Sequence, residues 1–298
     1  MGTSSKYGGP SPISALIPTF LEDTPRTAAP NEEIEKSPDK PLDKSGENPK
    51  EGEKKPIEQN KPSEPKPLPP LPPPASGGRF RTSRSNFNTF AESRDRGSLK
   101  RSLSSYVRTG TGGGRRAARR MGAAIPSVRR AISFVQDVAN AGINQALSHL
   151  GLGNLVGQPA EQALAVLTDV FCPEGGPIDQ GIAREAWDEA VLGLTEIDIT
   201  DITEVTAEQW QAVVTDFIAK TIEFKVINDV GAKGISLPQD VQAIDQLQSD
   251  LHELIQGAVD DAIGDRLNVG QTIPQNEIQG LVTDIYERSF AYLEALEE

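Results

Sequence analysis

Cysteine and histidine are scarce in this chain of 298 residues. Its one cysteine, Cys172, cannot form a disulfide within the chain, and with only two histidines there is no ligand set for a Cys- or His-based metal site. Cys172 follows an apolar helical run, which favours a buried structural thiol over a nucleophile. No run approaches the roughly 18 apolar residues that a membrane span needs. These absences predict a protein of the reducing cytoplasm without a membrane segment.

The sequence also lacks a secretory signal and the common catalytic motifs. Lys6 is followed by Tyr-Gly-Gly-Pro and a short apolar stretch, not by a sustained apolar core with a cleavage site. There is no GxxxxGK[ST], HExxH or GxSxG sequence. GTGGGRR has the glycines of a phosphate-binding loop but lacks its lysine, so we interpret it as a flexible hinge.

The acidic residues and the second histidine do not form a catalytic pattern either. The carboxylates between 179 and 298 have the spacing of exposed helix faces, which indicates a solvated acidic surface. His252 lies beside Asp250 and Glu253 on the polar side of its helix, where we expect a solvated histidine. We therefore predict a protein that is not an enzyme and holds no cofactor.

Charge is strongly segregated along the chain. Residues 1–78 carry 10 basic and 12 acidic side chains, residues 79–130 carry 14 and 2, and residues 131–298 carry 6 and 29. Asymmetry of this kind is typical of an interaction surface, or of two parts of one molecule that attract each other. It divides the expected folded domain, 79–298, into a basic subregion (79–130) and an acidic helical body (131–298).

The sequence of the first 78 residues predicts a flexible tail followed by a disordered tether. Residues 25–78 are rich in Pro, Lys and Glu without apolar periodicity, which predicts a long disordered region that cannot offset the cost of ordering its backbone. A coil of about 55 residues reaches roughly 40 Å. Residues 1–24 form a flexible tail with a short docking element, whose apolar residues recur at near-helical spacing: Ile13, Leu16, Ile17, Phe20 and Leu21.

Residues 79–130 alternate apolar residues with arginine and serine. Their spacing predicts two short amphipathic helices broken at Gly97. Nucleic acid is one possible partner, since cations suit phosphates and rings suit bases. The alternative, which helical spacing of the rings favours, is that the rings lie in the core and the arginines pair with the acidic helices. Four arginines follow the glycines: Arg115, Arg116, Arg119 and Arg120. Arg115 and Arg119 are four residues apart and therefore share one helix face, and the same holds for Arg116 and Arg120.

From Pro126 onward the pattern is helical, and we expect at least six helices. Pro126 and Pro159 each precede an apolar-periodic segment, and Thr206 to Gln209 is a capping box before another. The stretch EIDITDITEV alternates apolar and polar residues, which indicates a short strand or an extended loop. The fold class is therefore mainly α, a helical bundle preceded by a disordered Pro/Lys/Glu-rich region.

Several stretches resemble one known family. MGTSSKYGGP and LIPTFLED at the start are similar to the amino terminus of the QatB family of the Qat anti-phage defence system. RFRTSRSNFNTF, SYVRTGTGGGRRAARRMG and CPEGGPIDQGIAREAW resemble the body of that family. The resemblance implies three companions: an ATPase, a QueC-like enzyme of deazaguanine chemistry and a TatD-like metal nuclease.

The resemblance gives the opening decapeptide a role. A QueC-like enzyme activates a carboxyl-bearing deazaguanine with ATP, and the amine of Gly2, freed by removal of Met1, would replace ammonia as its nucleophile. Gly2 is then the modification acceptor. The residues that we expect the partner to recognise in this tail are Thr3, Ser4, Tyr7, Gly8, Gly9 and Pro10.

Two functions of different classes follow, and a plain structural subunit with an inert tail is the third alternative. The first is a defence-complex component whose amino terminus is a substrate of its QueC-like partner. The second is a nucleic-acid-binding adaptor that uses residues 79–130 to bring the nuclease to phage DNA.

Overall fold

The structure is a computed structural model that describes residues 78–174, 178–195, 199–231, 234–267 and 272–297. The expected tail (1–24) and all but the last residue of the expected tether (25–78) lie outside the described residues. The described residues fall within one compact unit, in which a single cluster of buried side chains runs from Phe87 to Leu293.

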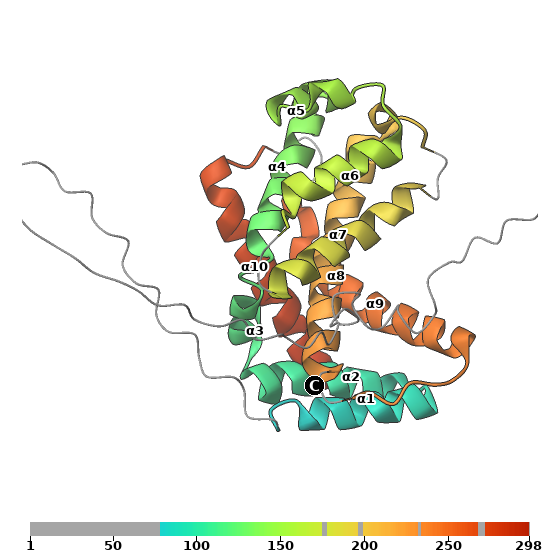
Figure 1. Cartoon of the computed structure of the whole chain (residues 1–298). Coiled ribbons are helices and arrows are strands. Elements are labelled where there is room, and N and C mark those ends of the chain that lie inside the picture. The colour runs from blue at the N-terminus through green and yellow to red at the C-terminus, as the bar shows by residue number, and fades with distance from the viewer. Residues whose placement is uncertain (1–77, 175–177, 196–198, 232–233, 268–271, 298) are drawn as a thin grey trace, which may run out of the picture. The chain divides into compact units, whose positions relative to one another are not determined.

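Helices make up nearly all of the described chain (Figure 1). The only β-type pairing among the described residues is an isolated bridge between Pro159 and Asp201. The mainly α fold class is thus confirmed. The helices are α1 (Arg81–Ser93), α2 (Arg96–Ser105), α3 (Gly114–Arg120), α4 (Ile125–Ala141), α5 (Ile143–His149), α6 (Ala160–Phe171), α7 (Ile178–Thr195), α8 (Ala207–Gly231), α9 (Val241–Ile263) and α10 (Gln275–Glu294). Short π or 3-10 segments are η3 (Tyr106–Thr111), η4 (Gly153–Leu155), η5 (Ile202–Glu204), η6 (Gly264–Leu267) and η7 (Ala295–Glu297).

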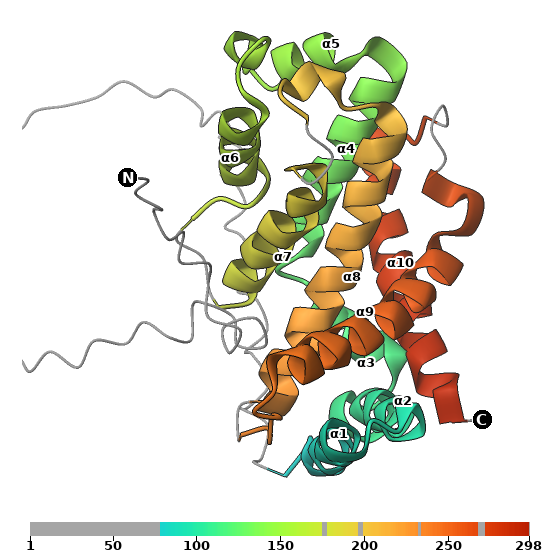
Figure 2. The same cartoon turned by 90° about the vertical axis from the view of Figure 1, so that its right-hand side faces the viewer.

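Helix α8 lies at the centre of the bundle, between α4, α7 and α9 (Figures 1 and 2). It is 25 residues long, and its buried residues lie on all of its sides. A helix that is apolar all round must be surrounded by other elements. Two of its charged side chains, Glu223 and Lys225, are buried as well, so the packing of α8 requires charged partners on its neighbours.

The helix starts follow the expected signals. The backbone N–H of Thr206 donates to Gln209 Oε1 at 2.7 Å, and the N–H of Gln209 donates to Thr206 Oγ1 at 3.2 Å, which is the predicted capping box. Pro126 lies in the first turn of α4, and Pro159 is the residue before α6. Seven α-helices follow one another from α4 to α10 in the described residues, in line with the expectation of at least six.

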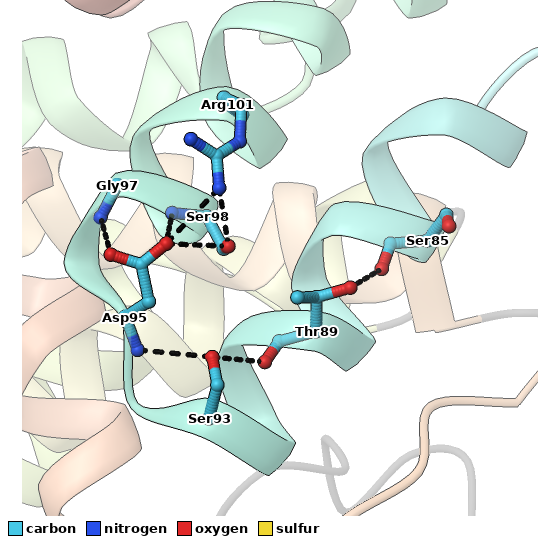
Figure 3. Close-up of polar contacts among 7 residues, drawn as sticks. All are labelled: Ser85, Thr89, Ser93, Asp95, Gly97, Ser98 and Arg101. Carbon is cyan, nitrogen blue, oxygen red and sulfur yellow. Dashed lines mark hydrogen bonds and ion pairs between the residues drawn. The ribbon is translucent and has the colours of Figure 1, made fainter.

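The break between α1 and α2 falls at Arg94 and Asp95, so the prediction of a break at Gly97 is wrong. Arg94 has a left-handed backbone with φ of 60° and ends α1. The Asp95 carboxylate then accepts the backbone N–H groups of Gly97 and Ser98, each at 3.0 Å, and the hydroxyl of Ser98 at 2.8 Å (Figure 3). Because this carboxylate caps the first turn, Gly97 is helical.

The described part of EIDITDITEV is a loop that contains one 3-10 turn: Asp201 and Val205 are extended, and Ile202–Glu204 form η5 between them. The backbone N–H of Ala160 donates to Thr200 O at 2.9 Å, and Asp201 caps η5 through the N–H of Thr203. Ile202 and Val205 are buried, and their separation of three residues is that of the 3-10 turn, which places both on the side that packs on the core.

Candidate functional site

The predicted acceptor Gly2 and the predicted recognition residues of the tail lie outside the described residues. What the structure does place is the second predicted site, the arginines of α3. We therefore build the description from that helix and from the glycine-rich turn before it.

The glycine-rich turn is packed against α10. Gly112 and Gly113 have φ of 82° and 107°, a region that L side chains rarely adopt. A Cβ at Gly114 would lie 3.1 Å from the backbone nitrogen of Ala291, so a larger residue would push α3 and α10 apart by a few tenths of an ångström. The interpretation of GTGGGRR as a flexible hinge is therefore wrong, because the glycines serve backbone geometry and close packing.

The anion position at the start of α3 is already occupied by a side chain of the chain itself. Glu294 Oε2 accepts the backbone N–H of Gly114 at 3.0 Å. The backbone oxygen of Glu294 in turn accepts the hydroxyl of Ser104 at 2.9 Å. The carboxylate thus stands where a phosphate would bind the N–H, and it ties the end of α10 to α2 and α3.

Arg120 points inward and makes a charged contact with the central helix. Its guanidinium donates to Asp229 Oδ2 at 2.6 Å, and the Asp229 side chain is only 9% exposed. Burial disfavours the charged guanidinium, but the carboxylate of Asp229 outweighs this effect and raises the pKa of Arg120. The Arg120 guanidinium also lies 5.7 Å from the centre of the Phe80 ring, which stacks on Tyr106. Arg120 is thus half-buried and packs at the edge of the core.

Asp229 is shared by several donors. The hydroxyl of Tyr106 donates to Asp229 Oδ2 at 3.0 Å, and Lys225 Nζ lies 3.4 Å from Asp229 Oδ1. Lys225 also donates to Asp179 of α7 at 2.9 Å. Burial and the Asp229 carboxylate together raise the pKa of Tyr106 well above its ordinary value, which keeps the phenol a donor. This network joins η3, α3, α7 and α8.

The other three arginines of α3 are exposed. The Arg115 side chain is 83% exposed, and its Nε lies 3.7 Å from Glu287 Oε2, a distance typical of a weak surface ion pair. Arg116 lies over Gly112: a Cβ added at Gly112 would be 2.8 Å from Arg116 Nη1. Arg119 is exposed too. Within the described part of the chain, neither Arg116 nor Arg119 forms an ion pair.

Several arginines of the basic subregion pair with the acidic body. Arg84 Nε donates to Val230 O of α8 at 2.7 Å, Arg94 donates to Ala243 O of α9, and Arg96 donates to Glu253 at 2.6 Å. The rings of the subregion lie in or against the core. The interpretation that the rings pack inward is confirmed for Phe80, Phe87, Phe90 and Tyr106. Pairing of arginines with acidic residues of the body is confirmed for Arg96 and Arg120, whereas Arg84 and Arg94 bind backbone carbonyls of α8 and α9.

His252 is not the solvated residue that its neighbours in sequence suggested. Its Nδ1 lies 2.9 Å from Glu223 Oε2 and its Nε2 lies 3.3 Å from Asp216 Oδ1, both on α8. Glu223 is nearly fully buried, and burial raises the pKa of Asp216. Both ring nitrogens of His252 therefore face carboxylate oxygens of α8. The prediction failed because it considered only the neighbours of His252 on its own helix, whereas its partners lie on α8.

Sequence reasoning also missed the acidic partners of the arginines. Asp229 and Glu294 lie far along the chain from Arg120 and Gly114, and no spacing rule joins them. One signal was available for Asp229: it follows Lys225 by four residues in the segment FKVINDV, where apolar residues surround both charges, which indicates a buried pair. Cys172 is buried as expected, and burial raises its pKa to about 11.

None of the helices that the structure describes has the length and apolar character needed to cross a bilayer.

Fold and site together define a mainly α-helical protein whose basic helices are held by its acidic ones, with three arginines of α3 left at the surface. A family model described as Qat anti-phage system associated protein QatB matches residues 112–293. The match covers more than half of the chain, and the chain belongs to the QatB family. It is a component of the Qat anti-phage system. Comparisons with curated proteins and with solved structures give no match.

Proposed function

We propose that this chain is a non-enzymatic component of its anti-phage complex and that its amino-terminal glycine is the acceptor for a deazaguanine. The observation that carries the proposal is the opening MGTSSKYGGP, which precedes a long polar tether in a chain of the QatB family. The matched region begins at Gly112, so the family model supports membership of the system, and the opening residues support the acceptor role.

The proposed chemistry forms one amide bond. ATP activates the carboxylate of the deazaguanine by transfer of AMP, which releases pyrophosphate. The amine of Gly2 attacks the acyl carbon, AMP leaves with the carboxylate oxygen, and the amine loses a proton. Gly2 is the least hindered amine that a chain terminus can offer, and Thr3 and Ser4 are small enough for a narrow channel. Tyr7 and the residues Gly8, Gly9 and Pro10 supply an anchoring ring and a backbone able to turn.

The test is intact-mass analysis of the chain after co-expression with the QueC-like partner. We expect the chain without Met1 to gain the mass of the deazaguanine acid less one water. Gly2→Pro replaces the primary amine by a ring-locked secondary amine and should abolish the gain. Gly2→Ala, the matched control, keeps a primary amine and should retain part of it. An unshifted mass with partner, ATP and precursor present, or a full shift in Gly2→Pro, would refute Gly2 as the acceptor.

A second candidate is the nucleic-acid-binding adaptor, favoured by the exposure of Arg115, Arg116 and Arg119. Replacing all three by Gln removes about three phosphate contacts and should lower the slope of log affinity against log salt for duplex DNA by roughly 2.7. Stability should hardly change, because exposed charges contribute little. If the parent chain has no submicromolar affinity for DNA at physiological salt, these arginines serve a protein partner instead.

A further inference from the structure

An apolar hollow opens on the bundle beside the start of α8. It has a volume of about 380 Å³. Its lining is aliphatic and comes from the first turns of α6, the last turns of α7 and the loop before α8: Ala160, Leu164, Leu192, Leu194, Ile199 and Val205, with Glu161 as its one charged residue. Leu192 is 51% exposed, one of the most exposed large apolar side chains of the described residues. We call these residues the α6–α7 groove.

The chain contains a segment suited to this groove. Residues 13–21 place five large apolar side chains at near-helical spacing within nine residues, interrupted by Pro18. An isolated helix of that length is marginal in water, so the segment needs a surface to be ordered. Its five apolar side chains match an aliphatic hollow better than they match the charged surface around α3.

The linker between residues 13–21 and α1 is long enough to reach from the start of α1 to the α6–α7 groove. Arg84 of α1 binds the carbonyl of Val230 in the last turn of α8, whereas Val205 of the groove lies two residues before the start of α8. At 1.5 Å per residue the 25 residues of α8 separate these points by about 37 Å. Figures 1 and 2 both show α1 and α6 toward opposite ends of α8. A coil of about 55 residues has a root-mean-square length of roughly 40 Å.

We propose that residues 13–21 of this chain dock in the α6–α7 groove. A linker gives the highest effective concentration when its root-mean-square length matches the span, as it does here, so even weak docking is populated within one chain. Docking leaves Gly2 to Pro10 free beyond the groove. This last consequence rests on the proposed function: the body would hold the base of the tail while the acceptor enters the partner.

The test is photo-cross-linking in the full chain. Phe20 is replaced by benzoylphenylalanine, and cross-linked peptides are mapped by mass spectrometry. We expect cross-links within one chain to residues 160–164, 192–194 and 199–205. Leu192→Asp should reduce their yield at least several-fold, because a charge in the groove opposes apolar docking. Val241→Asp, at a residue that is 43% exposed on α9 outside the groove, is the matched control and should leave the yield unchanged. The helical spectrum of each variant shows that it has folded.

Three results would overturn the docking. They are cross-links only between different chains, cross-links to another face, and a yield that Leu192→Asp leaves unchanged. The experiment uses the chain alone, so it does not depend on modification of Gly2. Groove cross-links in a chain that its partner never modifies would refute the proposed function but support the docking. Modification of Gly2 without groove cross-links would refute the docking but support the proposed function.

Discussion

At the scale of residues, neighbouring arginines of one short helix have different roles. Arg120 reaches the buried carboxylate of Asp229, whereas Arg119 beside it is exposed. The difference follows from the helix: successive side chains point about 100° apart, so one faces α8 and the other faces solvent. Sequence spacing placed Arg116 and Arg120 on one face, yet only Arg120 meets a partner across the interface.

The role of Arg120 predicts a large effect on stability. Arg120→Ala leaves Asp229 with Tyr106 and Lys225 but without its shortest ion pair. Breaking a buried pair costs several kcal/mol, and because the Arg120 side chain is 30% exposed we expect a smaller loss of about 1–3 kcal/mol. Arg119→Ala is the control and should change the free energy of unfolding by less than about 0.5 kcal/mol. Urea unfolding measures both, and equal effects would contradict the structural role of Arg120.

At the scale of elements, close packing decides how η3 and α3 are held. A Cβ at Gly110 would lie 2.5 Å from the ring of Phe80, which is stacked on Tyr106 with ring centres 5.1 Å apart. The residues around Gly110 therefore accept no larger side chain unless the stacked rings move.

Gly110→Ala should accordingly destabilise the fold by about 1–3 kcal/mol through overpacking. Gly257→Ala provides the matched control, since that glycine lies within α9 and a Cβ there meets nothing within 4 Å. It should stabilise the chain by about 0.5–1 kcal/mol, because alanine favours the helix. The midpoints of urea unfolding should therefore move in opposite directions. Two shifts of the same sign would show that the Phe80 ring moves aside at little cost.

The elements also show how far the sequence predicts the structure. Signals that act within a few residues, such as the capping box at Thr206 and the proline before α6, predicted the helix starts correctly. The break at Arg94 and Asp95 was missed because a capping carboxylate outweighed the glycine at position 97. Contacts such as His252 with Glu223 could not be predicted, since they depend on which helices become neighbours.

At the scale of the whole molecule, the core consists of residues from both charge blocks. Phe90 of α1 and Leu103 of α2 belong to the same buried cluster as Trp210 and Phe290 of the acidic body. The basic subregion is therefore an integral part of the described fold, and a chain cut at residue 131 would lose part of its core. The division into a basic and an acidic part describes charge and surface, whereas packing joins the two.

The same core predicts that residues 79–298 fold without the first 78. Every buried residue of the described cluster lies at position 87 or beyond, and both tryptophans of the chain, Trp187 and Trp210, are fully buried in it. A chain that starts at Arg79 should therefore show a helical spectrum and one cooperative melt, with the emission of buried tryptophan lost in the same transition. A separate peptide of residues 25–78 should show no transition, because it lacks the apolar residues to form a core. If the shortened chain instead aggregates or melts without cooperativity, residues before Arg79 supply part of the core, and docking of residues 13–21 would then be essential for folding.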